Sequence, residues 1–257
     1  MTFRRSLAIV LCAVALASCS KNGFQDLSGP VPGASVKFFN FGVNAPQVNF
    51  FANDTKMTAV SSADTTGKEN PLGTKYGTAA SGGLYVGIEP GQYTMSGRIS
   101  DTAADHNTPI SNVQATFEDG KYYSFYQSGI YDANAKTVDA FIVEDPVPQQ
   151  IDYTVAYVRF VNASSNSNPM TLYATSTGGG PETAIGGAVA YKSAGDFITI
   201  PEGSYNLATR ENGSSTNAIA SGDPVSFSAG RVYTVTAYGD MTATDDNAPA
   251  LNSTANR

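Results

Sequence analysis

The chain contains a single histidine, His106, in the hydrophilic segment 101–107. A histidine oriented by an aspartate can activate a serine nucleophile. However, the chain has no Gly-x-Ser-x-Gly motif, which would present such a serine on a sharp turn before a helix. The glycine run 178–180 also lacks the Lys-Ser/Thr pair of a phosphate-binding loop. We therefore predict no catalytic residues, no enzymatic activity and no cofactor.

Three aspartates near the C-terminus, Asp240, Asp245 and Asp246, are the candidates for a metal site. Carboxylate oxygens on loops are the ligands that calcium prefers, and each ion takes about six to eight of them. The spacing of the three aspartates matches no familiar calcium loop. We therefore predict a solvated acidic loop without a bound metal, with calcium as the alternative.

Aromatic residues crowd the segment 122–126, and Tyr122, Tyr123 and Tyr126 are candidate ligand-binding residues. Tyrosine rings can stack on sugars or anchor a protein partner. Adjacent residues of a strand point to opposite faces, so we expect one of Tyr122 and Tyr123 in the core and the other outside. The alternative to ligand binding, which we prefer, is cross-strand packing.

Basic residues recur at matching positions of the chain, Lys37 with Arg159 and Arg98 with Arg210. Long basic side chains on strands commonly cover apolar surface and pair with an acid on a neighbouring strand. We predict this structural role for all four residues and no ligand bound to them.

The N-terminus has the features of an export signal. Arg4 and Arg5 precede an apolar run over residues 6–15, and small residues follow it. A run of about ten residues is too short to cross a hydrocarbon layer of ~30 Å as a helix. The segment Leu16–Cys19 resembles the lipobox of bacterial lipoproteins, in which the signal is cut before a lipid-modified cysteine. We predict a lipoprotein signal peptide over 1–18, lipidation of Cys19 and a flexible tether over 19–33.

Composition narrows the class of protein. Charged residues make up 14% of the chain and the formal net charge is -7, whereas soluble domains average about 25% charged residues. An acidic chain lacks the basic face that nucleic acid requires, so nucleic acid is excluded as a partner. The 25 glycines and 13 prolines are typical of a turn-rich β-protein and argue against a helical bundle.

The chain repeats itself, and the repeat predicts the architecture. Four blocks of sequence recur in the same order, and each has the residue pattern of a strand and a turn. The paired blocks are Val36–Asn40 with Val158–Asn162, Val48–Phe51 with Met170–Tyr173, Ile88–Tyr93 with Ile200–Tyr205, and Phe117–Tyr123 with Phe227–Tyr233. Gly120 and Gly230 occupy hairpin turns between apolar segments of the two copies, and apolar and polar residues alternate with the period of a half-buried strand.

These patterns predict an all-β fold of two tandem immunoglobulin-like β-sandwiches with antiparallel sheets. We expect the first sandwich over 34–145, a proline-containing linker over 146–151 and the second sandwich over 152–257. Since Cys12 is removed with the signal, no cysteine remains to pair with Cys19, and we expect no disulfide.

The repeated blocks resemble the DUF4397 family, a bacterial domain of unknown function. Val158–Ser164 is similar to the opening strand of that family, Ile200–Tyr205 to its Pro-x-Gly-x-Tyr element, and Ala229–Val235 to its Ala-Gly-x-x-Tyr-Thr-Val strand. The histidine usual in the family's opening strand is replaced by Asn40 and Asn162. The resemblance covers both copies and implies a fold, but it implies no activity.

We therefore expect a cell-envelope lipoprotein without catalytic activity that serves as a binding, adhesion or structural module. Its membrane contact is the lipid on Cys19, and a protein or glycan is its expected partner. Ser20 is not the aspartate that retains such proteins at the inner membrane, so we expect the outer membrane. The alternative is a carbohydrate-binding accessory lipoprotein or a pilus-like subunit whose edge strands pair with another chain.

Overall fold

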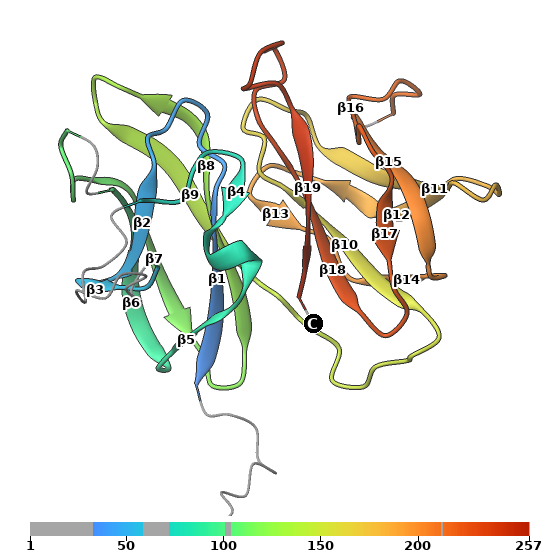
Figure 1. The fold of residues 1–257 in the computed structure, drawn as a ribbon, viewed down its shortest axis with the longest axis horizontal. Helices are drawn as coiled ribbons and strands as arrows, with labels where there is room; N and C mark the ends of the chain where they lie inside the picture. Colours follow the sequence, from blue (N-terminus) through green and yellow to red (C-terminus); the bar gives the residue numbers. More distant parts are fainter. Residues whose placement is uncertain (1–32, 59–71, 101–103, 212, 257) are drawn as a thin grey trace, which may run out of the picture. The chain divides into compact units, whose positions relative to one another are not determined.

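A computed structural model describes residues 33–58, 72–100, 104–211 and 213–256 of the chain. Within these ranges the regular structure is β, apart from one short 3₁₀ turn, η2 (Ala80–Gly83) (Figure 1). None of the described residues form a helix long and apolar enough to cross a membrane. The prediction of an all-β chain is confirmed.

The first half of the described chain forms two sheets. Its strands are β1 (Ala34–Asn40), β2 (Val48–Ala52), β3 (Thr55–Lys56), β4 (Thr78–Ala79), β5 (Val86–Ile88), β6 (Gly91–Ile99), β7 (Pro109–Phe117), β8 (Tyr122–Asp132) and β9 (Thr137–Glu144). One sheet has the order β4-β1-β8-β9, with β5 also paired to β1, and the other has the order β3-β2-β6-β7.

The second half repeats this plan. Its strands are β10 (Ala156–Asn162), β11 (Met170–Ser176), β12 (Thr183–Val189), β13 (Ser193–Ala194), β14 (Ile198–Ile200), β15 (Gly203–Glu211), β16 (Ile219–Ala220), β17 (Val225–Phe227), β18 (Val232–Tyr238) and β19 (Ala250–Ala255). The sheet orders are β13-β10-β18-β19, with β14 also on β10, and β12-β11-β15-β16, with β17 also on β15. The predicted linker, residues 146–151, lies between β9 and β10.

One ladder in each half differs from the expected antiparallel sheets. β1 pairs with β8 in parallel, with Val36 opposite Tyr123. β10 pairs with β18 in parallel, with Val158 opposite Tyr233. Parallel neighbours require a long crossover connection, and here the chain leaves the first strand, builds the other sheet and then returns. The sheets that contain β1 and β10 are therefore mixed, and the prediction of purely antiparallel sheets is wrong for them.

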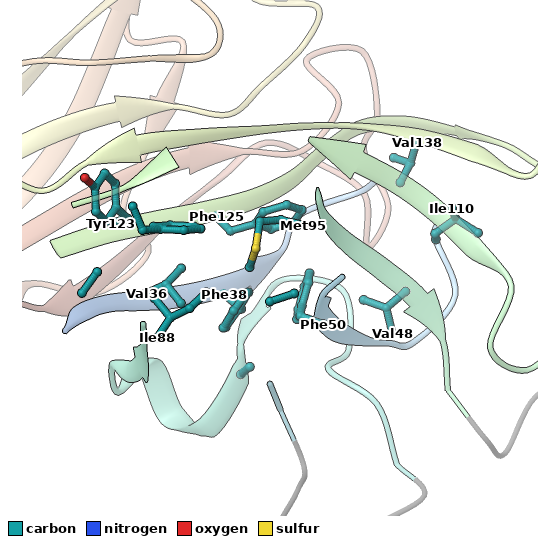
Figure 2. Close-up of a cluster of buried hydrophobic side chains, with 14 of the residues drawn as sticks. Val36, Phe38, Val48, Phe50, Ile88, Met95, Ile110, Tyr123, Phe125 and Val138 are labelled. Atoms are coloured by element: carbon teal, nitrogen blue, oxygen red, sulfur yellow. The ribbon is translucent and has the colours of Figure 1, made fainter. Parts of the chain in front are cut away.

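The core of the first half lies between its two sheets, where aromatic and aliphatic side chains meet (Figure 2). Phe38 from β1 stacks on Phe50 from β2, with ring centroids 5.1 Å apart. Phe125 from β8 meets Phe50 edge to face at 5.3 Å. The second half has the corresponding cluster around Phe160 and Leu172. The period-2 alternation read from the sequence therefore selects the residues that face each core.

The repeat predicted from the sequence is confirmed. Its first pair of matched blocks lies within β1 and β10, and the turn glycines Gly120 and Gly230 adopt φ of 70° and 73°. This left-handed conformation is open to glycine and strained for most other residues. Residues Gly33–Arg257 form one compact unit, so the two halves are packed against each other rather than separated by a free linker.

The central strands β1 and β10 are buried on both of their faces. All residues of β1 except Ser35 are buried, and in β10 all except the equivalent Tyr157 are buried. A strand on the surface of a sandwich would bury alternate residues only. Both faces of β1 and of β10 are therefore covered, one by the core of its own half and the other by a cluster that contains residues of both halves.

Removing the ring of Phe38 should destabilise the first core strongly. Phe38 is 1% exposed, and Phe38→Ala should lower the free energy of unfolding by about 3–5 kcal/mol because it leaves a cavity. Tyr153 is 77% exposed, so Tyr153→Ala should change that free energy by less than about 0.5 kcal/mol. Urea denaturation followed by circular dichroism measures both. Equal transition midpoints for the two variants would contradict this assignment of the core.

Candidate functional site

The most unusual chemistry of the structure is a set of buried charged side chains between the two halves. Arg159 on β10 is 0% exposed, Lys37 on β1 is 1% exposed, and Asp145, directly after β9, is 1% exposed. Charged side chains are rarely buried completely unless they are paired. These three residues therefore define the candidate site, which we call the junction network.

Arg159 is the centre of the junction network. Its Nη2 forms an ion pair with Asp145 Oδ1, its Nη1 donates to the carbonyl of Glu144 at 2.9 Å, and its Nε donates to Thr234 Oγ1 at 3.0 Å. The guanidinium carbon Cζ lies 4.8 Å from the ring centroid of Phe197. The planar fork of arginine suits such a site because several donors are satisfied at once.

Asp145 is satisfied on both carboxylate oxygens. In addition to the ion pair with Arg159, its Oδ2 accepts hydrogen bonds from Tyr85 Oη at 2.6 Å and from Ser124 Oγ at 2.7 Å. Burial and the neighbouring carboxylate raise the pKa of Tyr85, so this phenol remains a donor. Asp145 connects the end of β9 to both halves.

Lys37 occupies the position in the first half that Arg159 occupies in the second. Its Nζ donates to the carbonyl of Ala255 at the end of β19 and lies 4.3 Å from the ring centroid of Tyr85. Burial lowers the pKa of Lys37 to about 8, while the negative charge of Asp145 acts in the opposite direction and the positive charge of Arg159 lowers it further. Lys37 and Arg159 thus each have a carbonyl and an aromatic ring as partners, and Arg159 has in addition the ion pair with Asp145.

The contacts of Lys37 and Arg159 are reciprocal between the repeats. Tyr123 of β8 is opposite Glu144, and Tyr233 of β18 is opposite Ala255. Glu144 and Ala255 are therefore equivalent positions, and each accepts a hydrogen bond from the basic residue of the other half. The next residues, Asp145 and Asn256, are equivalent as well. Ser124 Oγ donates to the former at 2.7 Å, and Thr234 Oγ1 donates to the latter at 2.9 Å.

The predicted role of Lys37 and Arg159 is therefore only partly correct. Arg159 does pair with an acid, but that acid belongs to the end of the other half rather than to a neighbouring strand. Arg98 and Arg210 also pair with an acid, but each acid lies beside a strand, Asp54 between β2 and β3 and Glu182 before β12, and not on a neighbouring strand. Arg98 pairs with Asp54 at 3.1 Å and Arg210 with Glu182 at 2.7 Å, and each guanidinium carbon lies 4.4 Å from the ring centroid of an aromatic residue on a neighbouring strand.

An aromatic cluster lies beside the junction network. It contains Phe39, Phe41, Tyr126, Phe141, Val161 and Ala163, with Tyr191 and Tyr238 packed against it. Tyr126 stacks on Phe39 at 4.7 Å and on Phe141 at 5.0 Å, whereas Phe41 stacks on Tyr238 from the second half at 4.3 Å. The cluster covers the outer face of β1 that alternation alone leaves unexplained.

The structure separates the three candidate tyrosines. Tyr126 is fully buried in the aromatic cluster, and burial raises its pKa to about 12. Tyr123 is buried in the sandwich core, and its hydroxyl accepts the N–H of Glu118 at 3.2 Å. Tyr122 is 40% exposed and meets Tyr85 edge to face at 5.0 Å. Tyr123 and Tyr122 face inward and outward as predicted, but the three residues do not form one binding surface.

The candidate aspartates serve the local loop. Asp240 Oδ1 accepts the N–H and the hydroxyl of Thr242 at 2.8 and 2.7 Å and the amide of Asn166 at 2.7 Å. These hydrogen bonds lower the pKa of Asp240. Asp245 Oδ1 accepts the N–H of Asn247 at 2.9 Å. No three histidine, cysteine, aspartate or glutamate side chains converge within the described ranges.

Two further candidates lie outside this arrangement. His106 is exposed in the turn before β7. Cys19, together with the predicted signal peptide and most of the tether, lies outside the described residues. The sequence indicated neither Asp145 nor Tyr85 as a functional residue. The one signal that pointed to the junction network was the recurrence of a basic residue at Lys37 and Arg159.

Comparison with known proteins identifies the family of the chain. The model of DUF4397, a domain of unknown function, matches residues 34–173 and 156–256. No curated protein matches the chain. Among solved structures, that of a candidate cell adhesion protein from Bacteroides eggerthii aligns with 88% of this chain and 97% of its own, with 8% identity and a TM-score of 0.23. A similarity this low supports no inference about fold or function.

Breaking the junction ion pair should cost far more than breaking a surface pair. Arg159→Met leaves the Asp145 carboxylate buried without its cation, so the free energy of unfolding should fall by about 3–5 kcal/mol. Arg210→Met removes a partly exposed pair (side chains 22% and 33% exposed) and should cost about 0–1 kcal/mol. Urea denaturation of both variants measures the difference.

The double variant Arg159→Met/Asp145→Asn tests the assignment further. This variant leaves no buried charge without its partner. Its loss in the free energy of unfolding should therefore be smaller than the sum of the losses of the two single variants. A loss for Arg159→Met no greater than for Arg210→Met would show that the buried pair does not hold the junction.

Proposed function

Because the chain belongs to the DUF4397 family, a domain of unknown function, we propose a role from its own residues: a lipid-anchored, non-catalytic protein of the bacterial cell envelope. The observation that carries the proposal is the position of Cys19. It follows Leu16-Ala17-Ser18 at the end of an apolar run that Arg4 and Arg5 precede. Acyl chains on this cysteine would hold the protein on a membrane, because each buried methylene contributes about 0.8 kcal/mol.

The use of buried charge supports a non-catalytic role. In the described part of the chain, the deeply buried charged groups Arg159, Asp145 and Lys37 contact one another or backbone carbonyls between the halves. His106 lies exposed in a turn instead of beside these groups. Such an arrangement suits a module that presents surfaces to a partner, in binding, adhesion or architecture.

The start of the sheets is compatible with a tether. Gly33, the first described residue, donates its N–H to Asp119 Oδ1 at 2.6 Å and accepts the N–H of Gly120 at 2.9 Å. The segment 20–33 that precedes β1 has 14 residues, which reach at most roughly 50 Å when extended. The sandwiches can therefore stand clear of the lipid surface and meet a protein or glycan. Ser20 at the position after the cysteine directs our proposal to the outer membrane.

Replacing Cys19 should abolish lipid attachment. Wild-type protein made in its native host should incorporate labelled palmitate and sediment with the membrane fraction, whereas Cys19→Ala should take up no label. Cys12→Ala is the matched control, because Cys12 lies within the predicted signal peptide, and this variant should label like wild type. Equal labelling of Cys19→Ala and wild type would rule out the anchor.

A further inference from the structure

The two halves of the junction network differ in one chemical respect. Arg159 contacts the carboxylate of Asp145, but the residue equivalent to Asp145 in the second half is Asn256, a carboxamide. Lys37, the equivalent of Arg159, already bonds to the carbonyl of Ala255, which is directly bonded to Asn256. A primary amine and a carboxamide thus occupy positions whose counterparts in the other repeat touch.

We propose that Lys37 and Asn256 are joined by an intramolecular isopeptide bond between Nζ and Cγ. The bond would link β1, the first strand, to the end of β19, the last. The equivalent pair cannot react in this way, because the guanidinium of Arg159 stays protonated and has no free amine.

The surroundings of Asn256 suit an attack on its carboxamide. Asn256 is 8% exposed, so water is largely excluded from the reacting groups. Thr234 Oγ1 donates to Asn256 Oδ1 at 2.9 Å, which polarises the carbonyl and stabilises charge that develops on this oxygen. Asn256 Nδ2 donates to Tyr85 Oη at 2.9 Å, and Tyr85 donates to Asp145 Oδ2 at 2.6 Å. A proton path therefore runs from the leaving nitrogen to a carboxylate.

Lys37 is suited to act as the nucleophile. Its side chain is buried, and its Nζ lies 4.3 Å from the ring centroid of Tyr85, whose hydroxyl accepts the hydrogen bond from Asn256 Nδ2. Because burial lowers the pKa of Lys37 to about 8, roughly a tenth of the amine is neutral at pH 7, far more than in an exposed lysine. Only the neutral amine can attack a carbonyl carbon.

The bonds balance without an oxidant or other reagent. The lone pair of Nζ forms a bond to Cγ, and the π electrons of the carbonyl move to Oδ1. The proton lost by Nζ passes by way of Tyr85 and Asp145 to Nδ2. The carbonyl then re-forms as the bond from Cγ to Nδ2 breaks, and ammonia leaves. In this scheme Asp145 is a positioning residue, since it acts through Tyr85.

The isopeptide bond removes the free-energy cost of keeping a charged Lys37 ammonium buried. An ammonium buried without a carboxylate is unfavourable, whereas an amide is neutral, and the charge departs with ammonia. The link would also close nearly the whole described chain into one covalent loop. A cross-link that closes a long loop stabilises the folded protein because it restricts the conformations of the unfolded chain.

Peptide mapping of the full chain purified from cells tests the bond. Trypsin cuts after lysine and arginine, so an unmodified chain yields separate peptides that end at Lys37 and Lys56. The linked chain should instead yield residues 22–56 joined to residues 232–257, about 17 Da lighter than the sum of the two because ammonia is lost. Recovery of the free peptide 38–56 in full yield would overturn the proposal. Lys37→Met and Asn256→Leu should both lack the joined peptide, and the exposed-site control Lys121→Met should retain it.

The pH dependence of the free energy of unfolding gives a second test, which compares wild type with Lys37→Met and requires no peptide mapping. A free Lys37 amine would have a pKa of about 8 when folded and 10.5 when unfolded. Between these values the unfolded chain would bind more protons, so wild type would gain stability over Lys37→Met as pH rises from 8 to 9.5. Asp145, Arg159 and Tyr85 face this site in both proteins. A linked Lys37 cannot titrate, so we expect a constant difference, and a rising difference would overturn the proposal.

Discussion

The arrangement of the two repeats depends on the buried ion pair between Arg159 and Asp145. Moving two charges out of water costs several kcal/mol for each ion, and the cost is recovered only when geometry and additional hydrogen bonds are favourable. Here Glu144, Thr234, Ser124 and Tyr85 supply those additional bonds. The pair is satisfied in one relative position of the halves, because its members come from different repeats. A displaced arrangement would leave both charges unpaired.

The aromatic cluster adds affinity where the ion pair adds specificity. Equivalent positions of the two repeats carry residues of different size: Phe39 and Tyr126 are opposite each other in the first half, and Val161 and Thr236 take these places in the second. Large side chains on one face thus meet small ones on the other. Two copies of either face would overlap or leave voids, and both are costly in a close-packed interior. The duplicated sequences have therefore diverged into complementary faces.

Such a junction bears on function as well as on stability. The two sandwiches share a buried polar network and an aromatic cluster and belong to one compact unit. The described residues concentrate their unusual electrostatics inside the molecule, and their surface carries scattered ion pairs such as Arg98 with Asp54. This distribution is compatible with the binding or structural module proposed above.

The β class, the repeat, the turn glycines Gly120 and Gly230 and the residues that share a face of each strand could be predicted from the amino-acid sequence, because these depend on spacing along the chain. It also marked Lys37 and Arg159 as equivalent. The burial of β1 and β10 on both faces, the interior position of Tyr126 and the role of Asp145 as counterion became visible in the three-dimensional fold. Alternation shows which side chains lie on a face, whereas the partner that covers it comes from residues distant in sequence. Whether a charge on that face is solvated or buried is settled only when both repeats have folded and met.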